Sequence, residues 1–247
     1  MNSNVCLKQL FGYSVSIAMT QSETVERILD SAEVLFAERG FAETSLRQIT
    51  GKAGVNLAAV NYHFGSKNAL IQAVFARFIE PFTRNLRESL QAAIAKNEHV
   101  SLDRLLRLLA TALVEVPSRS DKSLPVFMRL LGLAYTQSQG HLRKYLEQRY
   151  NSELRLFMKL LRQATPQLSS EERFWRMQFM LGALTFTMSS SEALASILQD
   201  KNGADAPAEG IVDQLVPFLS AGINAPGVPS VPLSSPPPPL ETPCTAS

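Results

Sequence analysis

The chain contains little of what builds several common classes of protein. Its 247 residues include only two cysteines, Cys6 and Cys244, which lie near opposite ends. Two distant cysteines indicate neither a disulfide framework nor a metal site, and they suit a reducing compartment. The longest apolar run, from Phe179 to Met188, has ten residues, whereas a membrane-spanning helix needs about 18–20. We therefore predict no metal and no membrane partner.

Catalytic signatures are missing as well. The three histidines, at positions 63, 99 and 141, are scattered along the chain. There is no Gly-x-Ser-x-Gly elbow and no glycine-rich phosphate loop, and nothing pairs a nucleophile with a base. We predict that the protein is not an enzyme and that it uses no cofactor.

Helix signals, by contrast, recur along the chain, and beyond residue 100 no persuasive strand pattern interrupts them. A capping box at Thr20 and Glu23 opens the first helix. We expect Gly40 to end it in a left-handed conformation, with Phe41 folded back as in a Schellman cap. Pro81 should kink or restart the fourth helix, because proline removes a helical hydrogen bond. The predicted fold class is all-α, with about nine helices, at 23–39, 45–53, 56–64, 66 onward, 102–116, 124–135, 141–163, 171–198 and 209–223.

Both ends of the chain differ from this helical part. Residues 1–18 loosely resemble a signal peptide, but Gly12 and several polar residues interrupt the apolar patch and no clear cleavage site follows. We interpret residues 1–19 as a disordered extension, with Met19 as an alternative start. Of the 24 residues from 224 to 247, eight are proline, so we expect a disordered tail, with a proline-rich docking motif as the alternative.

The segments 45–53 and 56–64 have the arrangement of a helix-turn-helix, whose short second helix lies in the DNA major groove. Gly54 provides the turn between them and Gly65 ends the second helix. A set of apolar residues faces inward and would hold both helices against the first one: Leu46, Ile49, Val55, Val60, Phe64, Phe36 and Phe41.

Positive charge gathers around this motif. From Thr44 to Lys67 the sequence holds Arg47, Lys52 and Lys67 and no acidic residue, a local charge of +3 in a chain of net charge +2. The predicted helix starts also direct backbone N–H groups outward, and such ends bind phosphate well. Charge and helix starts together indicate a nucleic-acid partner.

The sequence around the motif resembles the tetracycline-repressor (TetR) family. The resemblance runs from Ile28 to about Leu70 and is carried by Leu35-Phe36, Gly40-Phe41, Thr44-Ser45-Leu46-Arg47-Gln48-Ile49, Ala53-Gly54-Val55, Tyr62-His63-Phe64 and Ser66-Lys67-Asn68-Ala69-Leu70. Two later segments, 127–134 and 137–146, are similar to the PsrA-type regulators, a subgroup that responds to long-chain fatty acids.

This resemblance implies a fold and a set of DNA contacts. A three-helix DNA-binding domain with a helix-turn-helix would occupy residues 20–66, and a helical ligand-binding and dimerisation domain residues 67–223. Phosphate contacts would come from Thr44, Ser45, Arg47 and Lys67. The residues offered by the recognition helix to bases or nearby backbone would be Asn56, Leu57, Ala58, Ala59, Asn61, Tyr62 and His63.

Several of these residues have plainer interpretations. Asn56 is first a helix cap, His63 suits a structural hydrogen bond, and Tyr62 can be partly buried and merely positional. Many family members carry a polar or basic residue, then glycine and threonine, where this chain has 57–59 (Leu-Ala-Ala), and tyrosine is common where Asn61 stands. Base reading should therefore depend on Asn61, on contact with thymine methyl groups and on DNA shape.

The helix at 171–198 is apolar on two faces, and a helix of this kind must be covered on both. One face carries Trp175, Phe179, Gly182 and Phe186, and the other Phe174, Met177, Leu181, Leu184 and Met188. The family resemblance implies that this helix and 209–223 form the four-helix interface of a homodimer. A candidate pocket for a hydrophobic effector would be lined by Phe127, Met128, Leu131, Phe157, Met158, Trp175, Phe179 and Met180, with ordinary core packing as the alternative.

Two functional hypotheses follow. The leading one is a cytoplasmic, nucleoid-associated homodimeric repressor that binds operator DNA and is released by a fatty acid or acyl-CoA. The alternative is a helical lipid-binding or interaction protein without a regulatory role on DNA, against which the local charge of +3 argues.

Overall fold

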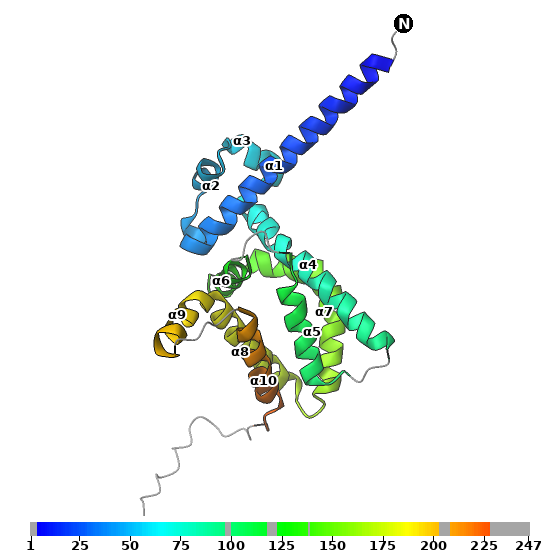
Figure 1. The fold of residues 1–247 in the computed structure, drawn as a ribbon, viewed down its shortest axis with the longest axis vertical. Coiled ribbons are helices and arrows are strands. Elements are labelled where there is room, and N and C mark those ends of the chain that lie inside the picture. The colour runs from blue at the N-terminus through cyan, green and yellow to red at the C-terminus, as the bar shows by residue number, and fades with distance from the viewer. Residues whose placement is uncertain (1–3, 97–99, 118–122, 138, 203–207, 228–247) are drawn as a thin grey trace, which may run out of the picture.

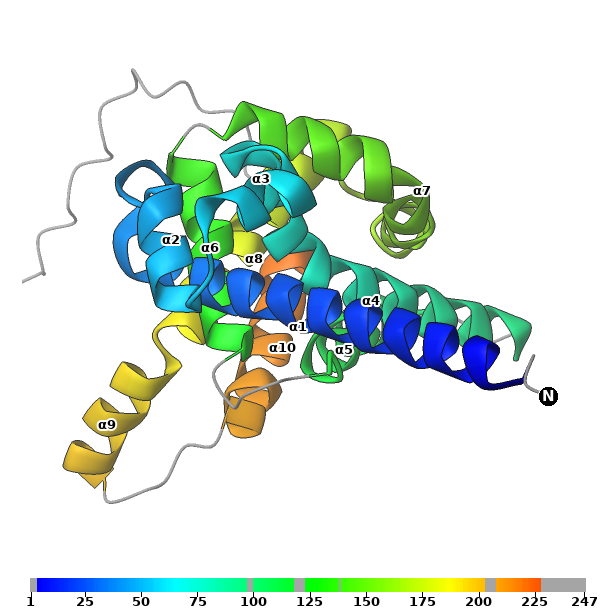
Figure 2. The ribbon, with the colours of Figure 1, turned by 90° about the horizontal axis from the view of Figure 1, so that it is seen from above.

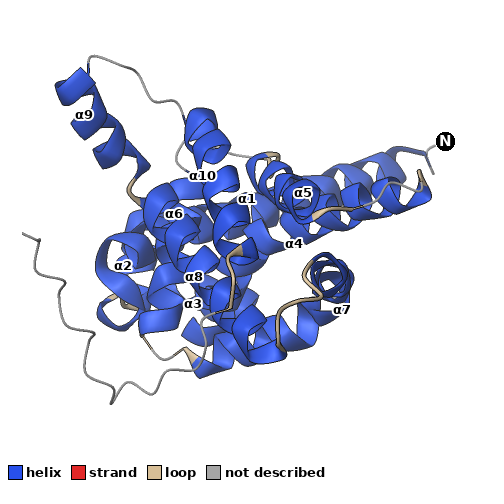
Figure 3. Ribbon diagram, turned by 90° about the horizontal axis from the view of Figure 1, so that it is seen from below, coloured by secondary structure: helices blue, strands red, loops and turns tan. Residues whose placement is uncertain are grey.

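The computed structural model describes residues 4–96, 100–117, 123–137, 139–202 and 208–227. Within these ranges all regular structure is helical and no strand is present, as Figure 3 shows. The predicted all-α fold class is therefore confirmed. The described helices are α1 (Asn4–Glu43), α2 (Leu46–Ala53), α3 (Leu57–Phe64), α4 (Lys67–Ala95), α5 (Leu102–Val114), α6 (Ser123–Thr136), α7 (Gly140–Ala164), α8 (Ser170–Ser189), α9 (Ser191–Asn202) and α10 (Ala208–Asn224).

The helices form two groups joined by α4 (Figure 1). Helices α2 and α3 lie beside the second half of α1 at one end of the molecule, whereas α5 to α10 make up the other end. Helix α4 starts against α1 and α3 and runs on along α5 and α7. Helix α9 projects from the end of α8 (Figure 2).

Helix α1 is longer than predicted. It begins at Asn4, whereas we expected residues 1–19 to be disordered and the helix to start near Glu23. The segment 4–19 contains no proline, and a helix that already exists grows by one hydrogen bond per added residue without a new nucleation step. At the other end of the chain, most of the predicted tail, 228–247, lies outside the described residues.

The end of α1 also differs from the expected Schellman cap. Gly40 has the predicted positive φ of 84°, but its ψ of 169° lies far from the left-handed helical region. The backbone is therefore extended there, and the Phe41 N–H leaves the helix to donate to Oε1 of Gln137, at 3.0 Å. The cap is supplied by a distant side chain instead of by the helix itself.

Two further boundaries were predicted incorrectly. Of the two alternatives predicted for Pro81, the restart is wrong, because α4 runs from Lys67 to Ala95 as one helix, and the kink stays a prediction. The predicted helix 171–198 is two helices, because α8 ends at Ser189. The hydroxyl of Ser189 donates to the carbonyl of Phe186 at 3.2 Å, and serine side chains compete in this way with the backbone pattern of a helix.

The buried residues form two hydrophobic clusters. The first contains Phe36 and Phe41 of α1 together with Phe75 of α4 and Phe127 of α6, so it joins the DNA-binding domain predicted at 20–66 to the rest of the protein. The second lies between the later part of α4 and helices α5, α7, α8 and α10. Among the described helices none has the length and hydropathy needed to cross a membrane.

Candidate nucleic-acid interface

The short helices α2 and α3 are held in place by side-chain caps at their N-termini. Ser45 and Gln48 form a reciprocal capping box, with the Gln48 N–H donating to Ser45 Oγ at 3.3 Å and the Ser45 N–H donating to Gln48 Oε1 at 2.7 Å. Asn56 accepts a hydrogen bond from the Ala59 N–H at 2.9 Å. The predicted turn is confirmed at Gly54, whose φ of 64° and ψ of 36° are left-handed.

The inward side of the two helices is the apolar set predicted from the sequence. Ile49 and Val60 are fully buried. Leu46, Val55 and Phe64 are partly buried against the same cluster, which contains the Phe36 and Phe41 rings. The burial of this set fixes which face of α3 is turned away from the protein.

The outward face of α3 is short and almost uncharged. Leu57, Ala58 and Asn61 are exposed, and 75% of Tyr62 is accessible to solvent, so the interpretation of Tyr62 as a partly buried residue is wrong. Ala59 is half-buried against the core. His63 is half-buried too, with its ring edge-on to that of Tyr62 at a centroid distance of 4.9 Å.

The three cations of the motif differ in their surroundings. Arg47 and Lys52 are exposed on α2. Lys67, the first residue of α4, is half-buried, and its Nζ donates to the carbonyl of Ala42 at 3.4 Å. Burial lowers the pKa of the Lys67 ammonium, and the nearby Glu43 carboxylate partly opposes that effect. Lys67 therefore contacts the C-terminal end of α1 as well as adding positive charge.

Thr44 requires a correction. We predicted a phosphate contact, but the residue is fully buried, and its hydroxyl donates to the carbonyls of Leu35, at 3.1 Å, and Gly40, at 2.8 Å. Its role in this structure is to close the extended turn between α1 and α2. Ser45, the next residue, is exposed and keeps its place in the interface.

The residues predicted to line an effector pocket lie in different parts of the described structure. Phe127 and Met128 are buried in the first hydrophobic cluster and Leu131 packs against it. Phe157 and Met180 belong to the second cluster, with Met158 against it. Trp175 and Phe179 are exposed on α8. The prediction combined residues whose helices turn them toward different parts of the protein.

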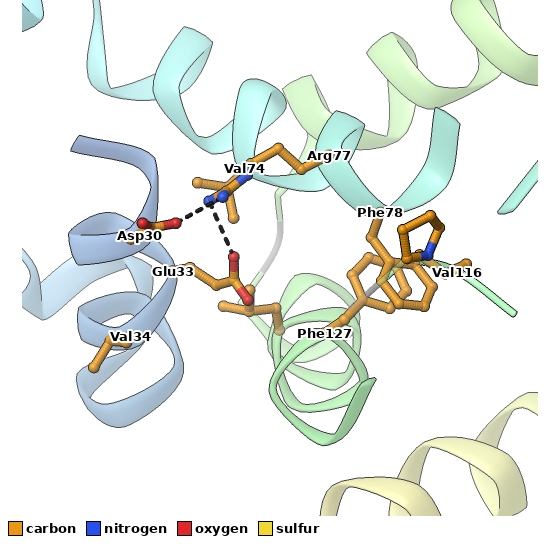
Figure 4. Close-up of a pocket in the computed structure, with 10 residues that line it drawn as sticks. Asp30, Glu33, Val34, Val74, Arg77, Phe78, Val116 and Phe127 are labelled. Atoms are coloured by element: carbon orange, nitrogen blue, oxygen red, sulfur yellow. Dashed lines mark hydrogen bonds and ion pairs between the residues drawn. The ribbon is translucent and has the colours of Figure 1, made fainter. Parts of the chain in front are cut away.

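A cavity of about 280 Å³ lies at the junction of the two helix groups (Figure 4). Its apolar side includes the Phe78 and Phe127 rings, which are stacked at a centroid distance of 3.8 Å. Its polar side includes Asp30 and Glu33 of α1 and Arg77 of α4. Of these residues, only Phe127 was predicted from the sequence to line a pocket.

Arg77 ties α1 to α4 at this cavity. Its guanidinium pairs with Asp30 at 2.6 Å, with Glu26 at 3.1 Å and with Glu33 at 3.4 Å, and only 18% of the Arg77 side chain is exposed. The three carboxylates are spaced four and three residues apart, which places them on one face of a helix. That spacing is visible in the sequence, but it does not reveal which distant cation they meet.

An aromatic face is exposed on α8 and α10. Phe174, Trp175, Phe179 and Phe186 of α8 are all more than half exposed, as is Phe218 of α10. Trp175 and Phe179 stack on each other with centroids 6.3 Å apart. The two helices contact each other, and we call this set of exposed rings the α8–α10 face. Arg176 of α8 donates to the carbonyls of Ile223, Ala225 and Pro226 at the end of α10.

Comparison with known protein families gives two matches. Residues 28–74 match the model described as "Bacterial regulatory proteins, tetR family", and residues 107–222 match "Tetracyclin repressor-like, C-terminal domain". The first match covers the end of α1, the helix-turn-helix and the start of α4. The second covers α6 to α10 with part of α5.

Curated relatives match the N-terminal part of the chain. The HTH-type transcriptional repressor Rv3405c of Mycobacterium tuberculosis is 40% identical over 95 residues, which are 38% of this chain and 49% of the relative. The probable regulator YttP of Bacillus subtilis is 36% identical over 26% of this chain and 30% of its own length. The chain thus matches at most about half the length of these relatives. Among solved structures, HlyIIR, a hemolysin II transcriptional regulator, is 19% identical over 81% of this chain and 98% of its own, with a TM-score of 0.49.

Proposed function

We propose that this chain, which belongs to the tetracycline-repressor family of bacterial regulatory proteins, is a DNA-binding transcriptional repressor. The observation that carries the proposal is the geometry of the helix-turn-helix. A two-turn helix, α3, has one face buried in the core and the other exposed, and the nearest charged side chains of the motif are cations. Such a helix fits the major groove while the cations and helix ends bind phosphate.

In this proposal some side chains bind phosphate and others contact bases. Arg47, Lys67 and the exposed ends of helices α2 and α4 supply affinity that does not depend on sequence. Asn61 is the main polar reader, since an amide side chain pairs with adenine in the major groove. Leu57 and Ala58 add contacts with thymine methyl groups. Because so few side chains contact base edges, the specificity of the repressor should also depend on DNA shape.

We further propose that the repressor is a homodimer joined through the α8–α10 face. Exposed aromatic patches of this kind mark interaction surfaces, and buried phenylalanine and tryptophan supply much of the energy of such interfaces. A two-fold dimer presents two recognition helices to half-sites about 34–36 Å apart. Acting on operator DNA, the dimer would work in the cytoplasm at the nucleoid.

The DNA-contact assignment predicts a specific loss of salt dependence. Replacing Arg47 by alanine should weaken operator binding across all sequences. The slope of log affinity against log salt concentration should fall by about one for each phosphate contact that the dimer loses. Operator fragments would first be selected from genomic DNA, and affinities then measured by gel shift at several salt concentrations. Arg155→Ala is the matched control, because Arg155 is exposed on α7, away from α2 and α3.

Unchanged affinity and an unchanged salt slope in Arg47→Ala would remove the DNA-contact assignment. Failure of the wild-type protein to retain any DNA at low salt would favour the alternative function, a helical lipid-binding or interaction protein.

We propose that the effector is a long acyl chain that enters the cavity between α1, α4 and α6. One observation supports this choice, the apolar wall around Phe78 and Phe127. The choice of an acyl chain itself comes from the expected resemblance of segments 127–134 and 137–146 to fatty-acid-responsive regulators. On the opposite wall the carboxylates of Asp30 and Glu33 outnumber the single Arg77 guanidinium, and this excess negative charge would repel a free carboxylate. An acyl thioester, whose head group near the chain is uncharged, should therefore bind better than the free acid.

This effector hypothesis predicts that oleoyl-CoA releases the operator at lower concentration than oleate. Val34 lines the cavity and is half-buried, so Val34→Trp should fill the space and abolish the response while leaving operator binding intact. Gel shifts with increasing ligand measure both effects. If neither ligand changes binding, the acyl effector is excluded and the DNA-binding function still stands.

A further inference from the structure

Gln137 connects the C-terminal helices to the start of the helix-turn-helix. It follows Thr136, the last residue of α6, and lies 96 positions from its hydrogen-bond partner Phe41. Its Oε1 accepts the Phe41 N–H at 3.0 Å, and its own carbonyl accepts a hydrogen bond from Gln139 Nε2 at 3.3 Å. The Gln137 side chain, from the C-terminal helices, therefore replaces the helical hydrogen-bond acceptor of the Phe41 N–H in α1.

The backbone of α1 is shaped to receive this side chain. A Cβ atom placed on Gly40 would lie 2.6 Å from Nε2 of Gln137, so the amide would have to shift from this position if any other residue stood there. Gly40 also has φ of 84°, a conformation that glycine adopts without strain. Thr44 then bonds back to the Gly40 carbonyl at 2.8 Å. Gln137 thus contacts the turn at residues 40–44, which leads directly to Ser45 and α2.

Helix α6 is firmly seated on its other side. It packs along α8, and a Cβ atom on Gly132 would lie 3.2 Å from Cγ2 of Thr185, so the two helices approach closely. Gly132 lies on α6 five residues before Gln137, which directly follows the last residue of that helix. A displacement of α8 would therefore move the end of α6 as well, because close-packed helices do not deform continuously.

We propose that Gln137 is a positioning residue that holds the DNA-binding domain to the end of α6 and so fixes the recognition helix through Gly40 and Phe41. This assignment rests on the proposed function for its effect on DNA. The hydrogen bond itself exists in the free protein and can be tested without DNA. Gln137 touches no nucleic acid in this scheme, because it acts only through the turn at residues 40–44.

The test compares two replacements of Gln137 in the full chain. Gln137→Met keeps the length of the side chain but lacks an acceptor, whereas Gln137→Glu keeps an acceptor for the Phe41 N–H. Hydrogen exchange of the Phe41 amide would be measured for each variant, with the amide of Val60 in α3 as an internal reference. Gln148→Met, at an exposed position on α7, is the control.

We expect Gln137→Met to speed exchange at Phe41 tenfold or more while Val60 keeps its protection, and Gln137→Glu to restore protection at Phe41. Operator affinity should fall three- to tenfold in Gln137→Met and stay near that of the wild type in Gln137→Glu and Gln148→Met. Equal acceleration at Phe41 and Val60 would mean general destabilisation and would overturn the proposal, as would unchanged exchange at Phe41.

The two proposals fail in different ways. If the wild-type protein binds no DNA but Gln137→Met selectively loosens Phe41, the repressor function fails and Gln137 remains the residue that positions the N-terminal domain. If DNA binds normally in every Gln137 variant, the repressor function stands and the role of Gln137 in positioning is refuted.

Discussion

Replacing Phe179 by aspartate should separate the protein into monomers and lower operator affinity by two to four orders of magnitude. Phe179 belongs to the α8–α10 face and is 68% exposed, with Trp175 stacked on it. A carboxylate there would have to be buried without a partner on both sides of a two-fold interface, which is strongly unfavourable. A monomer also loses the effective concentration that a second linked half-site provides, worth roughly 10²–10⁴ in avidity.

Sedimentation would measure the oligomeric state, and gel shifts would compare a full operator with a single half-site. The variant should bind the half-site as the wild type does, because α3 is unchanged. Ile94→Asp is the control, since Ile94 is an exposed apolar residue on α4. A Phe179→Asp protein that sediments as a dimer would refute the assignment of the interface to this face.

Replacing Phe75 by alanine should have the largest effect on stability, lowering the free energy of unfolding by about 3–5 kcal/mol. Phe75 is fully buried, and its ring lies between that of Phe41, at 6.2 Å, and that of Phe127, at 5.7 Å. The change would open a hole where α1, α4 and α6 meet. Because both helix groups share this cluster, we expect the melting curve to remain a single transition at lower temperature.

Denaturant unfolding followed by circular dichroism measures this loss. Tyr62→Ala is the matched control, because it also truncates an aromatic ring but at a residue that is 75% exposed. Its stability should change by less than about 0.5 kcal/mol. Two separate transitions in Phe75→Ala would show that the N-terminal helices unfold independently, contrary to a shared core.

The features that the sequence predicted well depend on neighbouring residues. Ser45, Asn56 and Ser66 cap their helices through side chains that reach three residues along the chain, so the caps are visible in the sequence. The turn at Gly54 and the burial of Val60 follow from equally local patterns. The helix-turn-helix could be located accurately for this reason.

The features that the sequence did not reveal depend on contacts between distant segments. Thr44 looks like any exposed residue before a helix, yet it is buried because the turn at Gly40 closes over it. The pairing of Arg77 with α1 and of Gln137 with Phe41 spans 44 to 96 positions. Hydrophobic spacing also fails to say which buried residues share a cavity, which is why the predicted effector pocket combined two separate clusters.

Pro81 lies inside helix α4 and removes one of its backbone hydrogen bonds. Proline has no N–H, so the carbonyl of Arg77 lacks its helical partner and the helix bends most easily between these two residues. The part of α4 before Pro81 is bound to α1 by the three ion pairs of Arg77 and by the burial of Leu70 and Phe75. An N-terminal fragment that keeps its own hydrophobic core should therefore extend to about Pro81. A fragment cut at residue 66 would lack the part of α4 that covers the aromatic residues of α1.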